Sequence, residues 1–250
     1  MPNRSGNTAA PKTKRTRTKK APPDYNATLI NRIQITPHLA IFQVRPDLEH
    51  YPFDAGQFAI LGLKHLESRV PESDPEPPVD EKKQQRLIRR AYSISSGSHE
   101  ENLLEFYVSL VTSGQLTPRL FAMTPGARLF LSPTAKGLFT LDRVPAGRGI
   151  LMVATGTGLA PYMSMVRTLA LGIGCPAQSM TIMHGARYSW DLGYRSELES
   201  LQQQCEKFRY LPVISRPETD KNWGGRHGRL NTLFEENSRE EMEEMCGLPL

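Results

Sequence analysis

The stretch Ile150-Leu-Met-Val-Ala-Thr-Gly-Thr-Gly-Leu-Ala-Pro161 decides the fold of the second half of this 250-residue chain. Its first four residues, Ile150 to Val153, are all apolar and predict a strand covered on both faces. Gly156 and Gly158 predict a tight turn, and Pro161 suits the first turn of a helix, where a missing N–H is tolerated. A strand, a glycine turn and a helix N-terminus together form an anion site, because free amides and the positive helix end converge there.

This turn is not specific when it is taken alone. No Lys-Ser or Lys-Thr pair follows it, so it is not a Walker A loop, and the complete G-x-G-x-x-G pattern is absent. An ordinary tight turn between a strand and a helix can have the same composition. Both interpretations therefore remain open until the surrounding elements are considered.

Length and composition indicate a globular chain that is long enough for one large or two medium domains. Apolar residues make up 38% of the chain, and it contains no run of about 18 apolar residues that could span a membrane. The three cysteines, Cys175, Cys205 and Cys246, lie far apart in the sequence. Their spacing indicates neither a disulfide scaffold nor a metal or cluster site, which fits a reducing compartment, and we expect a cytoplasmic protein.

The positive charge of the chain is concentrated at its N-terminus. The net charge is +5, but residues 1–20 hold seven of the 31 Lys and Arg residues and no acid, which leaves 24 cations against 26 acids elsewhere. Few apolar side chains occur in residues 1–23, so we expect a disordered basic tail. A polybasic arm for nucleic acid, an anionic surface or an acidic protein fits this composition, as does a solvated extension. The extension is favoured because no aromatic residues alternate with the charges.

Residues 24–145 predict a small antiparallel β-barrel. Short runs with strand character follow one another without helices between them, as is typical of barrels. A run rich in proline and charge at 66–88 predicts a mobile surface insertion. One short helix is expected near Leu116, with Thr117 as its N-cap and Pro118 at its first position. The predicted strands lie at 28–33, 39–44, 56–63, 91–95, 103–111 and 127–131.

Residues 146–250 predict alternating strands and helices, which is typical of a parallel sheet that binds ligands at the carboxyl ends of its strands. The glycine turn follows such an end, which favours the anion-site interpretation. Strands are expected at 150–153, 180–183 and 209–214, with Pro212 marking an edge or an irregularity.

Helices are expected between and after these strands. One helix should begin at Leu159 and stop at Gly172, and the next should have Asp191 as its N-cap. Two further helices are expected from about Leu230 and from Ser238. The apolar faces of the first two helices are Leu159, Met163, Val166 and Ala170, and Tyr194, Leu198, Leu201 and Cys205.

A second motif with chemical content lies in the barrel half, at Arg90-Ala-Tyr-Ser93. Arg supplies a fork for phosphate, Tyr a flat face for stacking, and Ser a small hydroxyl donor. These are the three contacts that a flavin dinucleotide needs. An alternating strand with an exposed Arg and a half-buried Tyr has the same residues, so the tetrapeptide alone leaves both interpretations open.

Four motifs occur in order along the chain, and each falls on an element predicted above. Together they resemble the bacterial ferredoxin/flavodoxin–NADP reductases, within the wider superfamily that joins an FAD barrel to a pyridine-nucleotide domain. The resemblance covers roughly residues 24–250, apart from the insertion. The motifs are Arg90-Ala-Tyr-Ser93, Gly114-Gln-Leu-Thr-Pro-Arg-Leu120, Ala154-Thr-Gly-Thr-Gly-Leu-Ala-Pro161, and His184-Gly-Ala-Arg187 with Tyr194-Arg195.

The resemblance implies an FAD site on the barrel. Arg90, next to Ala91, would hold the pyrophosphate. Tyr92 would stack on or beside the isoalloxazine, and Ser93 would hydrogen-bond near flavin N5, where hydride arrives. Four more residues would help to hold the cofactor: Tyr107, Gln115, Leu116 and Thr117.

The resemblance also implies an NADP site at the glycine turn. Thr155 would reach both the flavin and the nicotinamide, which makes it a catalytic candidate with Tyr92 and Ser93. The pyrophosphate would lie over the rest of the turn, at Gly156, Thr157 and Gly158.

Arg187 and Arg195 match the family's clamp for the 2′-phosphate. Guanidinium groups suit a dianionic phosphate, whereas an NAD site would hold a carboxylate there. Arg216 and Arg229 are weaker candidates of the same kind, and any of these arginines could instead be a solvated surface charge. His184 is interpreted as a residue that shapes the loop end of a strand, because hydride transfer needs orientation more than a base.

The implied activity is hydride transfer between NADP(H) and FAD, with single electrons passing between FAD and ferredoxin or flavodoxin. A reductase component of an oxygenase is one alternative, although its usual iron–sulfur cluster needs four grouped cysteines. A non-catalytic binding protein that uses the basic tail is another. We favour a monomer and expect no nucleic-acid partner.

One departure from the family concerns the C-terminus. The family continues with a further strand that carries Cys-Gly-x-x-x-Met, whereas Cys246-Gly-Leu-Pro249 follows an acidic run and resembles the end of a helix. We interpret the chain as ending before the motif, with an incomplete NADP domain.

Overall fold

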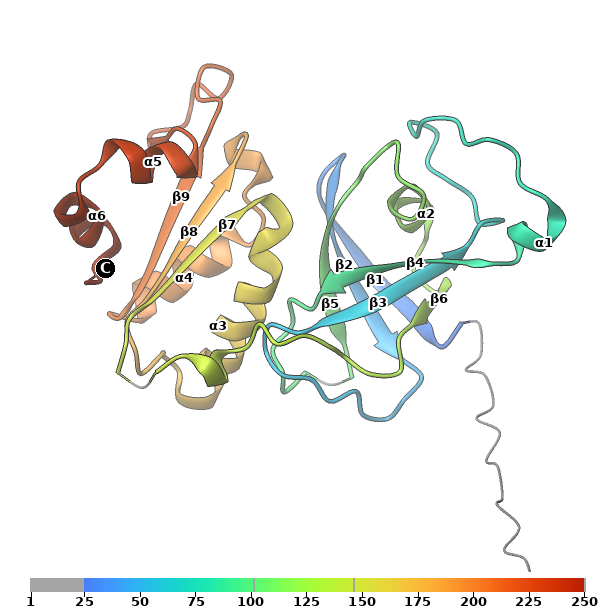
Figure 1. Cartoon of the computed structure of the whole chain (residues 1–250), viewed down its shortest axis with the longest axis horizontal. Coiled ribbons are helices and arrows are strands. Elements are labelled where there is room, and N and C mark those ends of the chain that lie inside the picture. The colour runs from blue at the N-terminus through green and yellow to red at the C-terminus, as the bar shows by residue number, and fades with distance from the viewer. Residues whose placement is uncertain (1–24, 101, 146, 250) are drawn as a thin grey trace, which may run out of the picture.

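The computed structural model describes residues 25–100, 102–145 and 147–249. They form an antiparallel barrel beside a parallel sheet flanked by helices, which confirms the predicted fold class (Figure 1). The basic tail at 1–23 lies outside the described residues. The barrel elements are β1 (Ala27–Thr36), β2 (Leu39–Pro46), β3 (Phe58–Lys64), α1 (Glu81–Gln84), β4 (Leu87–Ser93), β5 (Leu104–Ser109), α2 (Thr117–Ala122) and β6 (Arg128–Leu131).

The second half begins after a short 3-10 helix, Leu141–Arg143. Its elements are β7 (Ile150–Thr155), a 3-10 helix at Gly156–Leu159, α3 (Ala160–Ile173), β8 (Met180–Ala186), a 3-10 helix at Ser189–Asp191, α4 (Arg195–Gln204), β9 (Phe208–Ile214), β10 (Arg226–His227), α5 (Leu230–Glu236) and α6 (Arg239–Cys246).

The barrel strands run in the order β4-β3-β6-β1-β2-β5, with every pair antiparallel. Ile94 and Phe106 form a bridge beyond the end of β4, which joins the two outer strands and closes the barrel. Alternation along β2 places Phe42 in the barrel core and Ile41 against the second half. The β2 side of the barrel is therefore buried on both faces.

The second sheet has the order β10-β9-β8-β7 and is parallel throughout. α3 and α4 cover the face toward the barrel, while α5 and α6 pack on the other face, over Met183 of β8 and Leu211 of β9. β8 therefore lies between two helical layers, and six of its seven residues are buried. Pro212 lies in the part of β9 that pairs with β8 but not with the two-residue strand β10.

The prediction that the 150–153 strand is covered on both faces is wrong. β7 is the last strand of its sheet, and the helices α5 and α6 lie over its neighbours. Val153 is consequently 39% exposed, whereas Met152 and Ala154 on the other face are buried. An unbroken apolar run does not reveal that a strand lies at an edge.

Two predicted N-caps are also wrong. Asp191 lies in a 3-10 helix, and α4 begins only after Tyr194, whose φ of 63° interrupts the chain before the helix. Thr117 is the first residue of α2 rather than its N-cap. Its hydroxyl accepts the N–H of Val111 instead and donates to the carbonyl of the same residue. Helix α3 continues to Ile173 and ends at Gly174 rather than at Gly172.

The 66–88 segment includes the first two residues of β4, and its middle is anchored to the barrel. Arg119 of α2 is buried and donates to both carboxylate oxygens of Glu76, at 3.0 and 2.7 Å. Arg69 forms a second ion pair with Glu76, and Val70 packs against the barrel core. The segment is therefore held at its middle by a buried cation.

The cysteine spacing was misleading about pairing. Cys175, just after α3, forms a disulfide with Cys205, the residue that ends α4. The disulfide thus joins the C-terminal ends of the two helices, although 30 positions separate the cysteines. Cys246 has a buried free thiol at the last position of α6, and Gly247 caps that helix with φ 63°. The interpretation of Cys246-Gly247 as a helix end is confirmed.

Candidate functional site

A cleft of ≈ 1070 Å³ lies where the carboxyl ends of β7, β8 and β9 face the β1–β2 turn of the barrel. Thr155, Gly156 and Thr157 form one wall, and the barrel contributes the turn from Ile35 to Leu39. The carboxyl ends of parallel strands are where open α/β sheets bind ligands. The cleft is therefore the first place to examine for binding chemistry.

The glycine turn is open toward the solvent. Gly156 has a φ of +50°, a conformation that favours glycine, and a Cβ added at Gly156 or Gly158 would meet no atom within 4 Å. The 3-10 helix that starts at Gly156 leaves its first N–H groups without partners inside the helix. The turn can thus bring free amides close to an anion, as the sequence predicts.

A buried histidine lies beneath the turn. His184 Nε2 is 3.2 Å from the Gly156 carbonyl, and Nδ1 is 3.1 Å from the Tyr210 hydroxyl. Burial lowers the pKa of His184 to about 4, against the opposing effect of the bond to Gly156. The ring is therefore neutral near pH 7 and holds the end of the loop, in agreement with the role expected from the sequence.

Two exposed arginines, Arg187 and Arg229, line the cleft. Arg195 does not: its Nε donates to Glu199 at 2.6 Å, and its guanidinium lies 5.0 Å from the ring of Trp223. The structure thus brings Arg229, the weaker candidate, into the cleft in place of Arg195. Arg216 also lies outside the lining and donates to the Tyr188 hydroxyl.

The flavin candidates of the barrel lie on β4, away from this lining. Arg90 and Ala91 are exposed, and the Arg90 guanidinium donates to the carbonyl of Arg89, at 2.8 Å. Tyr92 and Ser93 are half-buried at the end of the strand. Burial raises the pKa of Tyr92 to about 12, with the charge of Arg90 acting in the opposite direction, so the phenol stays neutral.

Two of the three side chains in the predicted turn at 115–117 are used within the barrel. Gln115 is exposed and its carbonyl accepts from Arg119, Leu116 is buried in the barrel core, and Thr117 bonds to Val111. These three side chains do not line the cleft. The exposed Gln115 side chain and the backbone N–H groups of the turn are what remain for a ligand.

Comparison with known proteins identifies the family of the chain. Residues 152–249 match the family model of the oxidoreductase NAD-binding domain. The Escherichia coli flavodoxin/ferredoxin–NADP reductase is 35% identical over 213 residues, which cover 84% of this chain and 75% of that protein. The Buchnera aphidicola subsp. Baizongia pistaciae protein of the same name is 32% identical over 220 residues, covering 84% and 80%. The chain belongs to the flavodoxin/ferredoxin–NADP reductase family.

A solved structure of this family has the same architecture. A ferredoxin NADP+ reductase from Neisseria gonorrhoeae, with bound FAD and NADP, matches with a TM-score of 0.71 and 25% identity. The match covers 91% of this chain and 81% of that one. Both halves of the present reductase-family chain therefore have a counterpart in that structure.

Tyr107 lies between the two halves of the molecule. Its ring is buried between the halves, 5.2 Å from that of Tyr194, and its hydroxyl accepts the Gly193 N–H at 3.0 Å. It also donates to the carbonyl of Asp191 at 3.3 Å. The phenol is thus fully engaged in joining the barrel to the second sheet.

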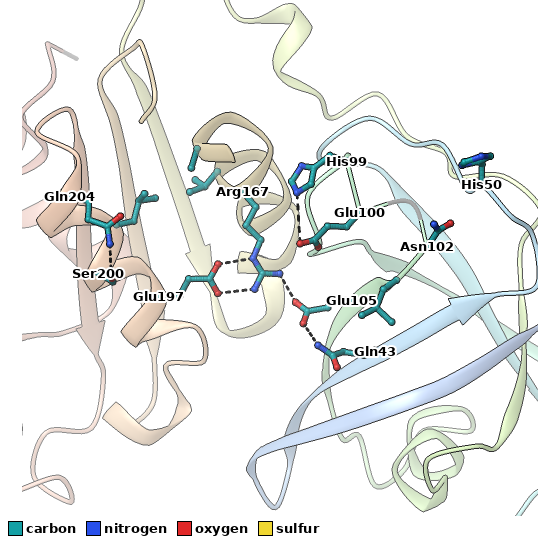
Figure 2. Close-up of a pocket in the computed structure, with 14 residues that line it drawn as sticks. Gln43, His50, His99, Glu100, Asn102, Glu105, Arg167, Glu197, Ser200 and Gln204 are labelled. Carbon is teal, nitrogen blue, oxygen red and sulfur yellow. Dashed lines mark hydrogen bonds and ion pairs between the residues drawn. The ribbon is translucent and has the colours of Figure 1, made fainter. Parts of the chain in front are cut away.

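A second cavity, of ≈ 890 Å³, opens between the halves, and sequence reasoning missed its central residue (Figure 2). Arg167 of α3 donates to both oxygens of Glu197, each at 2.7 Å, and it also ion-pairs with Glu105 of the barrel. Its Nη1 reaches the Ser95 carbonyl at 3.0 Å. Burial acts to lower the pKa of Arg167, but the bonds to the two glutamates outweigh it and raise the pKa, so the cation persists.

These three charged residues give no local signal, because they are spread over the chain at positions 105, 167 and 197. Only the approach of β5 to α3 and α4 unites them. Gln43 completes the group by donating to Glu105 Oε2 at 2.9 Å.

The structure also answers whether any of its helices could cross a membrane. Within the described residues, none is both long enough and apolar enough to do so.

Proposed function

We propose that this chain passes hydride between NADP(H) and FAD, and single electrons between FAD and ferredoxin or flavodoxin. The observation that carries the proposal is the cleft, where an open glycine turn faces two exposed guanidinium groups in a chain of the reductase family. The names of the relatives mention flavodoxin, ferredoxin and NADP.

The cleft residues suit NADP(H). The unpartnered amides of the Gly156 turn would bind the pyrophosphate, and the absence of any atom near a Cβ at Gly156 or Gly158 leaves room for close approach. The residue directly after β8 is Arg187, where an NAD site of this topology would place a carboxylate. We propose that Arg187 and Arg229 bind the 2′-phosphate, and that Arg195 acts outside the site.

Asp191 also lines the cleft and is the one acidic side chain of its described lining. Burial raises the pKa of Asp191, while the nearby charge of Arg187 lowers it. The described lining thus has two arginines against this one carboxylate, which favours an anionic ligand.

The β4 residues suit FAD. Arg90 has an exposed guanidinium for the pyrophosphate, beside the small Ala91. Tyr92 offers a neutral ring that is packed against the barrel on one side, and Ser93 a hydroxyl at the strand end. Backbone groups of Gln115, Leu116 and Thr117 can contribute, whereas the position of Tyr107 between the halves argues for a supporting role.

FAD, when bound, takes up a hydride as a pair of electrons and releases electrons singly. The chain itself contributes binding and orientation, because hydride transfer requires the reacting atoms to be aligned at short distance. Thr155 ends β7 with an exposed side chain on the wall of the cleft, and we propose that it touches both cofactors. Tyr92 and Ser93 would position the flavin from the barrel side.

A reductase component with its own iron–sulfur cluster is disfavoured. Such a cluster takes four thiolates, and the sequence has three cysteines, two of which are joined in a disulfide. One neighbouring fold, with 22% identity, is the ferredoxin reductase of a carbazole 1,9a-dioxygenase system, so the fold itself does not separate the two functions.

The direct test uses purified full-length protein loaded with FAD. We expect a flavin absorbance that NADPH bleaches without oxygen, with much slower bleaching by NADH at equal concentration. Addition of oxidised ferredoxin or flavodoxin should then restore the absorbance. A protein that retains no FAD, or a bound flavin that NADPH leaves oxidised, would contradict the proposal.

A further inference from the structure

Three buried or enclosed groups form a hydrogen-bonded chain beneath the cleft: the Tyr210 hydroxyl, the His184 ring and the Gly156 carbonyl. Tyr210 lies on β9 and His184 on β8, and these strands pair in parallel register. His184 is fully buried and Tyr210 is nearly so. Neither side chain lines the cleft, so neither is placed to touch a ligand.

The direction of each hydrogen bond follows from the chemistry of the groups. A carbonyl oxygen only accepts, so Nε2 of His184 must carry the proton that is donated to Gly156. A neutral imidazole has one N–H, which leaves Nδ1 as the acceptor for the Tyr210 hydroxyl. Burial keeps the ring neutral near pH 7, as its lowered pKa indicates, so the Gly156 carbonyl selects the Nε2-protonated tautomer and the Tyr210 hydroxyl donates to Nδ1.

This selection has a consequence for the turn. A trans peptide points its C=O and its N–H in opposite directions, so the carbonyl of Gly156 and the amide of Thr157 face opposite sides. His184 holds the carbonyl on the buried side, which turns the Thr157 N–H toward the cleft. That N–H belongs to the first turn of the 3-10 helix and has no partner within it.

The peptide needs such a restraint. Gly156 has a φ of +50°, and glycine moves between positive and negative φ at little cost. No atom lies within 4 Å of the place where a Cβ would be, so packing on that side does not fix the turn. The bond from His184 is the contact from outside the 3-10 helix that holds this carbonyl on the buried side.

We propose that His184, oriented by Tyr210, is a positioning residue that directs the Thr157 amide at the pyrophosphate of a nicotinamide dinucleotide. The inference rests on the proposed function for the identity of the ligand. It differs from the 2′-phosphate contacts of Arg187 and Arg229 in one testable respect. NADPH and NADH share the pyrophosphate, so the effect of His184 must be equal for both.

The main test is Tyr210→Phe, which keeps the ring and removes the donor to Nδ1. We expect the Kd for NADP+, the Kd for NAD+ and the KM for each reduced dinucleotide to rise by the same factor, about five- to tenfold. The FAD content and kcat at saturation should stay unchanged. In ¹⁵N spectra of labelled histidine, His184 should be the Nε2-protonated tautomer in both proteins, with the Nδ1 resonance shifted in the variant by loss of the Tyr210 hydrogen bond.

Two further variants and one control complete the experiment. His184→Gln retains a donor for Gly156 and an acceptor for Tyr210 and should recover most of the affinity, whereas His184→Leu should not. Tyr51→Phe is the matched control, because Tyr51 is a buried tyrosine whose hydroxyl bonds to Ser132 in the barrel.

The outcomes separate the inference from the proposed function. A wild type that binds neither NADP+ nor NAD+ contradicts the proposed function. A wild type that binds them, with Tyr210→Phe unchanged in both Kd values or changed for NADP+ alone, overturns the inference and leaves the function standing.

Discussion

The two cavities between the halves of the molecule differ in whether their arginines form ion pairs with carboxylates. In the cleft of ≈ 1070 Å³, Arg187 and Arg229 are exposed, and within the described residues neither forms an ion pair. In the cavity of ≈ 890 Å³, Arg167 is held by Glu105 and Glu197 from two different elements. The arginines of the cleft can therefore bind an anionic ligand. Arg167 instead uses its positive charge in ion pairs that join the barrel to the second half of the molecule.

The difference shows why a cavity with an arginine is not by itself a phosphate site. A guanidinium already bonded to two carboxylates offers few donors to a phosphate, and removing its partners would leave buried charge uncompensated. An exposed guanidinium without a carboxylate contributes little to stability and can bind an anion bidentately. Stability and cofactor affinity should therefore respond to different arginines.

The largest expected effect is on stability, at Arg167. Arg167→Met should lower the free energy of unfolding by about 3–5 kcal/mol, because Glu105 is only 8% exposed and would lose its counter-charge. Urea unfolding followed by circular dichroism measures this. Arg239→Met, which breaks an exposed pair with Glu243, is the control and should cost no more than about 0.5 kcal/mol. Equal losses of unfolding free energy in Arg167→Met and Arg239→Met would show that the buried ion pairs contribute no more than the exposed one.

A slightly smaller effect concerns pH and the floor of the cleft. The pKa of His184 in the folded chain, about 4, lies below the unfolded value near 6.5. Between these pH values His184 is protonated in the unfolded chain but not in the folded chain. The free energy of unfolding is therefore not reduced by His184 above pH 6.5, and it decreases as the pH falls toward 4. The loss from this group approaches about 3 kcal/mol.

The His184 contribution is isolated by comparing the wild type with His184→Gln, which cannot titrate. The unfolding free energy of the wild type minus that of the variant, measured from pH 7.5 to 4, should fall as the pH falls. Parallel curves would show that His184 titrates alike in both states.

The next effect is on cofactor selectivity. Arg187→Gln with Arg229→Gln should raise the KM for NADPH about 30- to 100-fold and that for NADH little, since charged hydrogen bonds to the 2′-phosphate are lost. Thermal stability should stay close to that of the wild type. Arg195→Gln is the matched control, because Arg195 is bonded to Glu199 and lies outside the cleft. A larger effect at Arg195 than at Arg229 would restore the assignment made from the sequence.

The smallest effect is expected at Tyr107. Tyr107→Phe should cost about 1–2 kcal/mol, because the Gly193 N–H loses its acceptor in a buried position. FAD content measured after gel filtration should not change. Loss of flavin from this variant would instead support the family-based prediction that Tyr107 holds the cofactor.

Sequence reasoning was most successful where local pattern decides structure. The closely spaced strands of the first half, the alternation of strands and helices in the second, and the helix start marked by Ser238 all follow from short-range periodicity and capping. Ser238 and Glu241 form the reciprocal capping box that their spacing permits. The turn at Gly156 belongs to this class, because a positive φ and a following Pro161 are local requirements.

The failures have a common physical origin. Whether β7 lies at an edge, whether Asp191 or Tyr194 precedes α4, and whether Cys175 meets Cys205 depend on neighbours distant in sequence. None of these contacts leaves a trace in the spacing of residues along the chain.

The sequence by itself determined the two kinds of sheet, the open glycine turn and the family motifs, because periodicity, backbone freedom and residue chemistry act over a few positions. Only the tertiary structure decided which cations remain available. The positive charge of Arg167 is balanced by Glu105 and Glu197, because β5 and α4 bring these two carboxylates to it. Arg195 forms an ion pair with Glu199, because α4 begins at Arg195 and places Glu199 one turn later on the same face. Charge pairing depends on distances in space, and the fold sets those distances.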